Sequence, residues 1–438
     1  MLLFRQFVDE DLGCGSYLVG DPSAGCAVVV DPSFAIEQYL EAAADAGVRI
    51  ERVLETHTHA DHVSGHGRFA LEHGLPVAIH PLAETEYPSE PLHDGEEIPV
   101  GDVRIRVLHT PGHRPEHCAF VVEDELALTG DSLFIGDAAR PDLAVPAREG
   151  AEDLFHSLGR LSALGDGVAV YPGHVAGSLC GVNMSSDRSS TIAHERASNA
   201  ALRFRDVQEF VLESASVAMP RPPTTERVVA INRGPWLARP DEPGELDAAN
   251  GATVLDVRPF TAYAAGHVPG AISVPESGSS FGTRAGFVLV PGERIVLHAS
   301  SRDEASASVR KLWAVGLLEI DGFVLAPEAS QTIDPVSVNE LKQLLHEPAV
   351  QVVDVRESSE RDEGYIPGST NIPFRLLRKL GPGALERSRP VVTVCESGAR
   401  ASIAASLLQR EGFDVRPVAD GGVATFDGDV VSFRRCGG

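Results

Sequence analysis

The sequence of 438 residues has no long apolar run, no secretory leader pattern and no paired cysteines. No stretch approaches the roughly 18 consecutive apolar residues of a membrane-spanning helix, so we expect no membrane segment. The apolar stretch at the N-terminus is too short, and acidic residues follow it too soon, for a signal peptide, so we expect a cytoplasmic protein. The six cysteines are scattered, which in such a chain favours free thiols over a disulfide framework.

Positive charge is also scarce. Lys and Arg total 37 against 63 Asp and Glu, a formal net charge of −26. A field of that sign repels phosphate backbones, which argues against nucleic acid as a partner. The length favours about two to four domains, each able to bury its own core. Nothing in the composition fixes the oligomeric state, and a homo-oligomer stays open.

Pro- and Gly-rich breaks mark two linkers in the chain. The first surrounds a run at 227–231 that we predict to be a strand, and the second lies near 326–335. The breaks predict three domains, which cover residues 1–240, 241–330 and 334–438.

The second and third of these domains share an internal repeat. Residues 255–275 align with residues 353–373 at a constant offset of 98, so that Asp256 matches Asp354. In each copy an apolar strand and a helix-forming stretch follow. Strands that alternate with helices in a unit of about a hundred residues predict a parallel α/β domain.

Short apolar runs bounded by turn signals fill the first 240 residues. They predict strands at 16–20, 26–33, 52–57, 77–80, 105–110, 118–122, 126–131 and 168–174, and helices at 34–47 and 151–164. Mixed strands and helices of this kind suit a layered α/β sandwich.

The strongest local signal is the segment THTHADHVSG at 56–65. It places the three imidazoles of His57, His59 and His62 and the carboxylate of Asp61 in a loop between a strand and a helix. Neutral imidazole and carboxylate are ligands for Zn, Fe or Mn. Solvated surface histidines are the simple alternative.

Three further ligand-type residues each follow an apolar strand and a glycine. They are His113, Asp131 and His174. Glycine lets the backbone turn sharply at a strand end, where sites in α/β folds gather. We infer that these three residues converge with the loop at 56–65 in a metal site.

Together these residues resemble the motif of the metallo-β-lactamase superfamily, H-x-H-x-D-H followed by a third His, an Asp and a last His. The resemblance spans roughly residues 1–240. It implies an α/β fold of the αββα sandwich type, with the metal at one edge of the sheets. The superfamily includes hydrolases and oxidoreductases, so the reaction is a separate question.

The segments 129–143 and 171–181 look like the persulfide dioxygenase branch. That resemblance implies one Fe(II) per chain, held by His57, His113 and Asp131. Two imidazoles and one carboxylate leave three coordination positions open, where the substrate sulfur and O₂ can bind side by side. The implied reaction oxidises a low-molecular-weight thiol persulfide with O₂ and water to a thiol and sulfite.

The same resemblance gives roles to the other residues. It implies that four residues near the metal orient its ligands and adjust its reactivity: His59, Asp61, His62 and His174. Arg140 and Asp142 carry over as substrate-side residues; a structural ion pair between the two is the alternative. Ala139 replaces the Gly that usually precedes that Arg. Cys180 is either a substrate-binding thiol near the metal or a packed structural thiol.

A binuclear zinc hydrolase similar to glyoxalase II is the rival interpretation, because all seven superfamily ligand positions are present. In it Asp131 would bridge two Zn²⁺ ions, and a metal-bound hydroxide would attack a thioester. The helical extension expected after His174 in such hydrolases is replaced here by a linker and the repeats.

In the second repeat Cys395 follows a strand and precedes a helix, in a loop C-E-S-G-A-R that ends at Arg400. The helix dipole and the arginine both favour the thiolate. The loop resembles that of a rhodanese, with Cys395 as the sulfur carrier, and a buried inert cysteine is the alternative. Glu396 should repel thiosulfate, so we expect persulfides to be the better donors. In the first repeat Ala299 replaces the cysteine, so that domain has no nucleophile.

The whole arrangement resembles bacterial persulfide dioxygenase–sulfurtransferase fusions, which implies a role in sulfide detoxification. Cys395 would pass sulfane sulfur to sulfite, forming thiosulfate, or deliver persulfide to the iron. The sequence leaves the direction of transfer, the native thiol carrier, the role of the Cys-less domain and any function of Cys180 open. A non-enzymatic persulfide sensor or scaffold is a further alternative.

Overall fold

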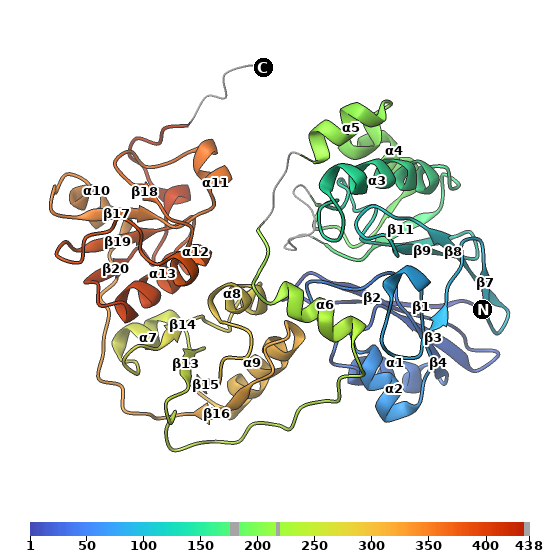
Figure 1. Ribbon diagram of the computed structural model, residues 1–438, viewed down its shortest axis with the longest axis horizontal. Helices are drawn as coiled ribbons and strands as arrows, with labels where there is room; N and C mark the ends of the chain where they lie inside the picture. Colours follow the sequence, from blue (N-terminus) through green and yellow to red (C-terminus); the bar gives the residue numbers. More distant parts are fainter. Residues whose placement is uncertain (176–183, 216–219, 433–438) are drawn as a thin grey trace. The chain divides into compact units, whose positions relative to one another are not determined.

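The computed structural model describes residues 1–175, 184–215 and 220–432. The first 240 residues contain two six-stranded sheets, which Figure 1 shows on its right-hand side. In spatial order the first sheet contains β1 (Leu3–Val8), β2 (Gly15–Asp21), β3 (Cys26–Val30), β4 (Arg49–Leu54), β5 (Val77–Ile79) and β6 (Glu90–Pro91). The second contains β12 (Ser190–Thr191), β11 (Ala169–Pro172), β10 (Leu126–Gly130), β9 (Cys118–Val122), β8 (Val103–His109) and β7 (Glu97–Val100).

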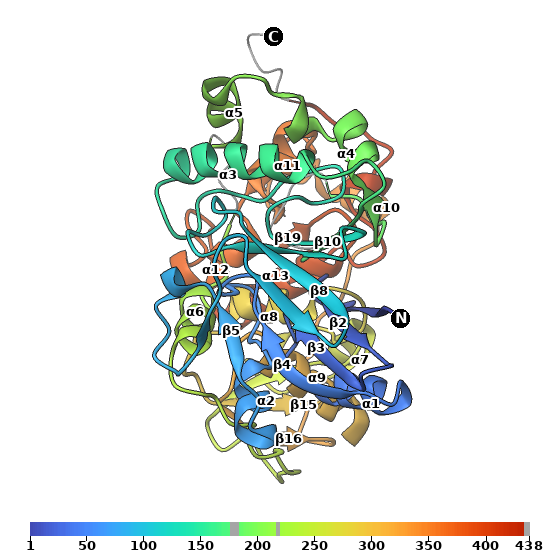
Figure 2. The ribbon, with the colours of Figure 1, turned by 90° about the vertical axis from the view of Figure 1, so that its right-hand side faces the viewer.

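The two sheets pack face to face, because apolar side chains of β2, β3, β8 and β9 form one common core. The outer face of the first sheet packs against α1 (Glu37–Asp45) and α2 (His66–His73). The outer face of the second sheet packs against α3 (Ala147–Ser162), α4 (Ile192–Ser198) and α5 (Val207–Ser214). Figure 2 shows this order of layers, helices outside and sheets between them. The predicted αββα sandwich is therefore confirmed.

The predicted strand at 227–231 is wrong, because this run lies inside helix α6 (Thr225–Arg233). Its buried residues are Val228 and Asn232, and the residue at its N-cap, Thr224, is buried as well. Their spacing of four residues places them on one face of a helix. The β-branched residues that suggested a strand are therefore accommodated by tertiary packing.

The two repeats form two four-stranded parallel sheets with the same strand order. The first sheet contains, in spatial order, β14 (Ile272–Ser273), β13 (Thr253–Asp256), β15 (Ile295–His298) and β16 (Ile320–Val324). The second contains β18 (Thr370–Asn371), β17 (Gln351–Asp354), β19 (Val391–Val394) and β20 (Val415–Pro417). The helices are α7 (Phe260–Ala265), α8 (Phe281–Val288), α9 (Arg302–Ala314), α10 (Val338–Leu344), α11 (Ser358–Glu363), α12 (Phe374–Leu380) and α13 (Ala399–Arg410). Both predicted parallel α/β folds are confirmed.

The chain folds into two units, each with its own packed interior. The first unit contains 1–240 together with Arg310–Leu317, and the second contains 241–309 and 318–438. The last turns of α9 therefore belong to the unit that holds the two six-stranded sheets.

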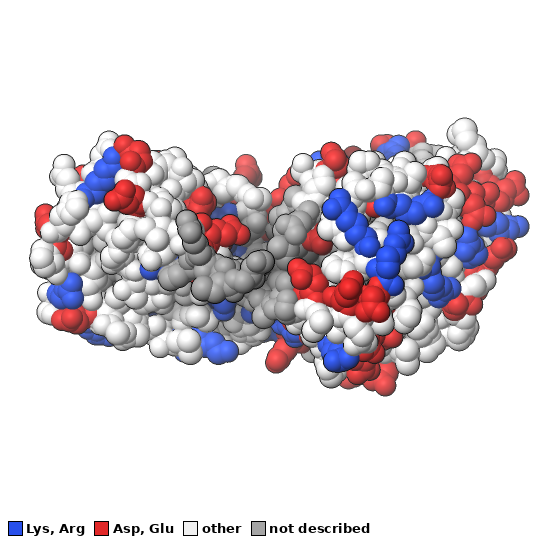
Figure 3. Space-filling model, turned by 90° about the horizontal axis from the view of Figure 1, so that it is seen from above, with Lys and Arg blue, Asp and Glu red and all other residues white. Residues whose placement is uncertain are grey.

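Among the described residues, no helix is both long and apolar enough to cross a bilayer. Figure 3 shows acidic and basic side chains intermixed on the face that it draws.

Candidate functional site

Three ligand-type side chains meet at one edge of the αββα sandwich. His57 lies in the loop after β4, His113 in the loop after β8, and Asp131 follows β10 directly. One donor atom from each lies within 4.8 Å of the others, and each residue is 1% exposed. Asp131 Oδ2 is 3.5 Å from His113 Nε2 and 4.0 Å from His57 Nε2. Three strand ends thus bring together residues that are far apart in the chain.

The donor set fits a metal ion, as two of its atoms show. Among the described residues, His57 Nε2 and Asp131 Oδ2 are buried polar atoms without a hydrogen-bond partner. Leaving such atoms unpaired in a protein interior costs about 1–3 kcal/mol each. A divalent cation between two imidazole nitrogens and a carboxylate oxygen would satisfy them.

The far side of each imidazole is held by a hydrogen bond. His57 Nδ1 donates to Thr56 Oγ1 at 2.9 Å, and Thr56 donates in turn to Asp31 Oδ2 at 2.8 Å. His113 Nδ1 donates to the carbonyl oxygen of Arg140 at 3.0 Å. Because Nδ1 carries the proton in both rings, the Nε2 lone pairs are left for a metal.

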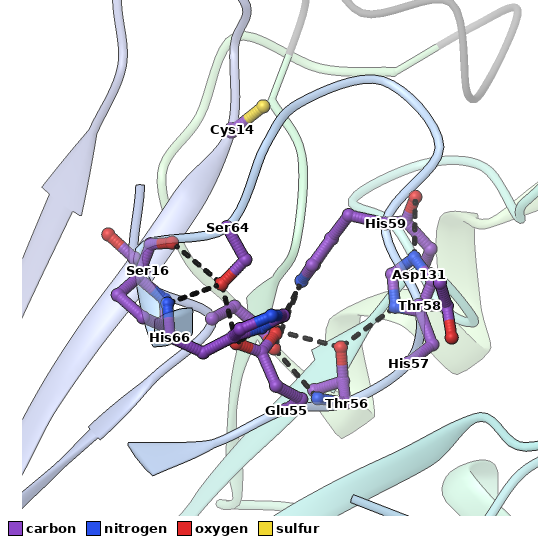
Figure 4. A network of polar contacts seen from close by, with 12 residues as sticks. Cys14, Ser16, Glu55, Thr56, His57, Thr58, His59, Ser64, His66 and Asp131 are labelled. Atoms are coloured by element: carbon purple, nitrogen blue, oxygen red, sulfur yellow. Dashed lines mark hydrogen bonds and ion pairs between the residues drawn. The ribbon is translucent and has the colours of Figure 1, made fainter. Parts of the chain in front are cut away.

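His59 lies in two groups of possible ligands, one with Asp31 and Glu55 and one with Asp61 and His62. Its Nδ1 is a buried atom without a hydrogen-bond partner among the described residues. Its Nε2 is 3.1 Å from Glu55 Oε2 and 3.3 Å from Asp31 Oδ1. Burial opposes the charged imidazole, but Asp31 and Glu55 together raise the pKa of His59 well above its usual value. Glu55 also binds His66 Nδ1 at 3.0 Å. Figure 4 shows this chain of contacts from His66 through Glu55 to His59.

Asp61, His62 and His174 form a second cluster beside the triad. His174 Nδ1 is 2.7 Å from Asp131 Oδ1, and His174 Nε2 is 2.8 Å from Asp61 Oδ2. Burial opposes ionisation of Asp131, but His174 and then His113 hold the pKa of this carboxyl well below its usual value. His174 therefore connects the two carboxylates.

Arg140 and Asp142 form the ion pair that the sequence left as an alternative. Arg140 Nε and Nη2 donate to the two carboxylate oxygens of Asp142 at 2.7 and 2.9 Å. Burial disfavours the carboxylate, but hydrogen bonds from Arg140 and Arg221 lower the pKa of Asp142 to about 2. Ala139 is buried and lies outside the positive-φ region, so alanine is accommodated there without backbone strain. Cys180 lies outside the described residues.

The sequence did not reveal Asn232, which stands on α6 and is 2% exposed. Its Nδ2 donates to the carbonyl oxygens of His59 and His62 at 3.0 and 2.8 Å. Its Oδ1 accepts a hydrogen bond from Ser64 N at 2.9 Å. The amide thus fixes three backbone groups of the loop at 56–65, which we call the metal loop. Asn232 lies about 170 positions further along the chain, and no local sequence pattern indicates such a contact.

Cys395 lies at the base of a loop between β19 and α13, where it is fully buried. The backbone N–H of Gly398 donates to its Sγ at 3.1 Å. Arg400 forms two hydrogen bonds with Glu360, at 2.6 and 2.7 Å. Glu396 accepts a hydrogen bond from Arg356 Nη1 at 3.0 Å. The loop thus brings a thiol, a backbone donor and two paired arginines together.

In the first repeat the equivalent position holds Ala299, which is buried at the end of β15. Asp256 in this repeat is bound by Arg258 and lies 3.0 Å from His298 Nδ1. The repeat keeps the frame of the fold without a thiol in its loop.

Comparisons with known proteins agree with this architecture. The model of the metallo-beta-lactamase superfamily matches residues 10–174, and the model of the rhodanese-like domain matches residues 240–324 and 337–428. A mitochondrial persulfide dioxygenase of Bos taurus is 29% identical over 235 residues, which are 53% of this chain and 87% of that protein. A hydroxyacylglutathione hydrolase of Maricaulis maris is 33% identical over 178 residues, 40% of this chain and 66% of the hydrolase. The crystal structure of a metallo-beta-lactamase from Staphylococcus aureus covers 74% of this chain and 98% of its own, with 27% identity and a TM-score of 0.68.

Proposed function

The chain combines a domain of the metallo-beta-lactamase superfamily with two rhodanese-like domains, and we propose that it is an iron-dependent persulfide dioxygenase coupled to sulfur transfer. Its fold and its relatives imply a metal-binding enzyme of sulfur metabolism. The proposed reaction is R–SSH + O₂ + H₂O → R–SH + SO₃²⁻ + 2 H⁺. We place this reaction in sulfide detoxification in the cytoplasm.

The observation that carries the proposal is the grouping of two imidazoles and one carboxylate around one point. One donor atom each of His57, His113 and Asp131 lies within 4.8 Å of the others, whereas His59 is bound through Nε2 by Glu55 and Asp31 and otherwise groups with Asp61 and His62. Two imidazoles and a carboxylate are the ligand set of non-haem Fe(II) oxygenases, which leave positions open for substrate and O₂.

Hydrogen bonds within the chain orient the residues that would bind this metal ion. Thr56 and the Arg140 carbonyl fix the two imidazoles with Nε2 turned toward Asp131. A bound Fe(II) would supply adjacent coordination positions for sulfur and O₂ and would relay electrons to O₂ from the outer sulfur of the persulfide, which is the group oxidised. Asn232 holds the backbone of the loop that carries His57. Arg140 and Asp142 lie beside this site as candidates for binding the thiol carrier.

Cys395 is the proposed sulfur carrier of the last domain. Its persulfide would react with sulfite according to Cys395–SSH + SO₃²⁻ → Cys395–SH + S₂O₃²⁻. The sulfite attacks the outer sulfur, and the Cys395 thiolate leaves. The Gly398 N–H, which donates to Sγ, would stabilise that thiolate.

One observation favours the rival zinc hydrolase: Asp61, His62 and His174 lie beside Asp131, where a second ion would need them. The similarity to a hydroxyacylglutathione hydrolase points the same way. In that enzyme class two Zn²⁺ ions and a metal-bound hydroxide would cleave a thioester without consuming oxygen.

The deciding experiment measures metal content, oxygen uptake and sulfite with glutathione persulfide as substrate. We expect about one iron per chain, and uptake that falls more than about 100-fold in His113→Ala because a ligand is lost. His73→Ala, which changes an exposed histidine at the end of α2, is the matched control and should retain activity. Two zinc ions per chain together with oxygen-independent thioester hydrolysis would overturn the proposal.

A further inference from the structure

Cys14, one of the six scattered cysteines, lies in the cluster of Asp61, His62 and His174. It stands directly before β2 and is 7% exposed. Its backbone forms an isolated bridge with His174, next to a hydrogen bond of 2.6 Å from Gly15 N to Gly173 O. The backbone therefore fixes the direction in which the thiol points.

The sulfur touches every one of these three side chains. Cys14 Sγ donates to Asp61 Oδ2 at 3.2 Å and lies 3.3 Å from His174 Nε2 and 3.5 Å from His62 Nδ1. These are the residues that would hold a second ion next to Asp131 in a binuclear centre. The thiol thus stands among all three of the donors that this ion would need.

The two halves of the centre differ in how their polar atoms are satisfied. In the triad, His57 Nε2 and Asp131 Oδ2 have no hydrogen-bond partner among the described residues. In the other half, His174 binds a carboxylate with each ring nitrogen, and Asp61 Oδ2 accepts hydrogen bonds from Cys14 and His174. His62 Nε2 is also without a partner among the described residues, but Asp61 and His174 are paired with each other and with Cys14. A second ion would have to displace these contacts, whereas an ion in the first half would pair atoms that lack a partner.

We propose that Cys14 occupies the second half-site as a hydrogen-bonded thiol and thereby limits the centre to one metal ion. This inference rests on the proposed mononuclear iron site and explains how a chain with all seven ligand positions holds one ion. Cys14 is in this sense a residue that determines metal number, and with it the choice between oxygenase and hydrolase chemistry. It acts by occupying space and by hydrogen bonding with Asp61, His62 and His174.

The test is a Co²⁺ titration of the metal-free full chain, followed by metal analysis and absorption spectroscopy. Wild type should bind one Co²⁺ per chain and show no thiolate-to-cobalt charge-transfer band. Cys14→Ala removes the sulfur and should raise the count to two. Cys14→Ser keeps a donor in the same place and should leave the count at one, and it also serves if the alanine variant does not fold.

Cys26→Ala is the matched control, since Cys26 is a buried thiol at the start of β3 that lies outside the cluster. Its count should stay at one. A count of one in Cys14→Ala overturns the proposal, and so does a second ion in wild type with a charge-transfer band that Cys14→Ala loses, which would make Cys14 a ligand. Oxygen uptake by wild type is scored separately, so a failure of the dioxygenase proposal is distinguishable from a failure of this one.

Discussion

The two rhodanese-like repeats share one frame and differ in one loop. In both, an arginine two positions after the end of the first strand binds the aspartate at the end of that strand and a carbonyl at the C-cap of the following helix. Arg258 Nη2 donates to Asp256 and, at 2.8 Å, to Gly266 O, and Arg356 Nη2 donates to Asp354 and, at 2.6 Å, to Gly364 O. This buried ion pair stabilises the frame whether or not the domain carries a nucleophile.

The loops that follow β15 and β19 differ in the polar groups that they contain. In the second repeat the Gly398 N–H donates to a thiol. In the first repeat the side chain of Glu304, five positions after Ala299, reaches back to accept from Ser300 N at 2.5 Å. Glu304 takes the sequence place of Arg400, so a carboxylate stands where the other loop has a cation. The two repeats thus keep the same fold and the same buried ion pair, although the residues of the loop that would carry out sulfur transfer differ.

The largest effect is expected for Cys395→Ser, which removes the only thiol found in either loop. Sulfur transfer should fall at least about 10³-fold, because a hydroxyl is a far weaker nucleophile toward sulfane sulfur than a thiolate. Oxygen uptake with glutathione persulfide should remain. Thiosulfate and sulfite are quantified in the same reaction, and continued thiosulfate formation would contradict the assignment.

Gly398→Ala should have the next largest effect. Gly398 has φ +101°, and a Cβ there would lie 2.8 Å from the carbonyl oxygen of Ala419. We expect a loss of about 1–3 kcal/mol in the free energy of unfolding and reduced sulfur transfer, because the strained backbone displaces the N–H from Cys395. Denaturant unfolding of the full chain measures the first. Gly412→Ala, also at positive φ but without a close backbone contact, should cost less.

Glu396→Gln should produce a change of a few fold in the opposite direction. It removes a negative charge from the loop and weakens the hydrogen bond from Arg356 Nη1, so thiosulfate should become a better donor by about threefold in kcat/KM. The rate with glutathione persulfide should change little. Glu411→Gln, which alters an exposed carboxylate of the same domain, is the control. If wild type already prefers thiosulfate to persulfide, the role given to Glu396 is wrong.

The smallest effect is expected for Ala299→Cys in a Cys395→Ser background. A thiol alone does not rebuild the loop, since the first repeat still lacks counterparts of Gly398 and Arg400. We expect sulfur transfer below about 1% of that of wild type. A gain above that level would show that the loop sequence matters less than the thiol.

Most of the fold could be predicted from local sequence patterns. Strand β9 (Cys118–Val122) and the 98-residue repeat could be predicted because alternation, turns and glycines are encoded locally. The predicted strand at 227–231 failed because β-branched residues dominate a segment whose helix is stabilised by distant contacts of Val228 and Asn232. The domain boundaries stay a prediction.

At the candidate site, residues of the ligand motif could be identified, but their partners could not. His57, His113 and Asp131 follow strands, and one donor atom of each lies within 4.8 Å of the others. Cys14 and Asn232 lie 47 and 171 positions from Asp61 and have no motif of their own. Only the folded chain shows that they touch the metal loop, because such contacts depend on tertiary packing.

The loop that carries the metal ligands is also held from far along the chain. Val63 N donates to the carbonyl oxygen of Ala314 at 2.7 Å, and Trp313 packs edge-on against Phe34. Both come from Arg310–Leu317, the part of α9 and its following turn that belongs to the first unit. A fragment truncated after residue 240 would therefore lack this segment. It would leave the Val63 amide unpaired and an aromatic face open to solvent, so metal retention measured on such a fragment would underestimate that of the intact protein.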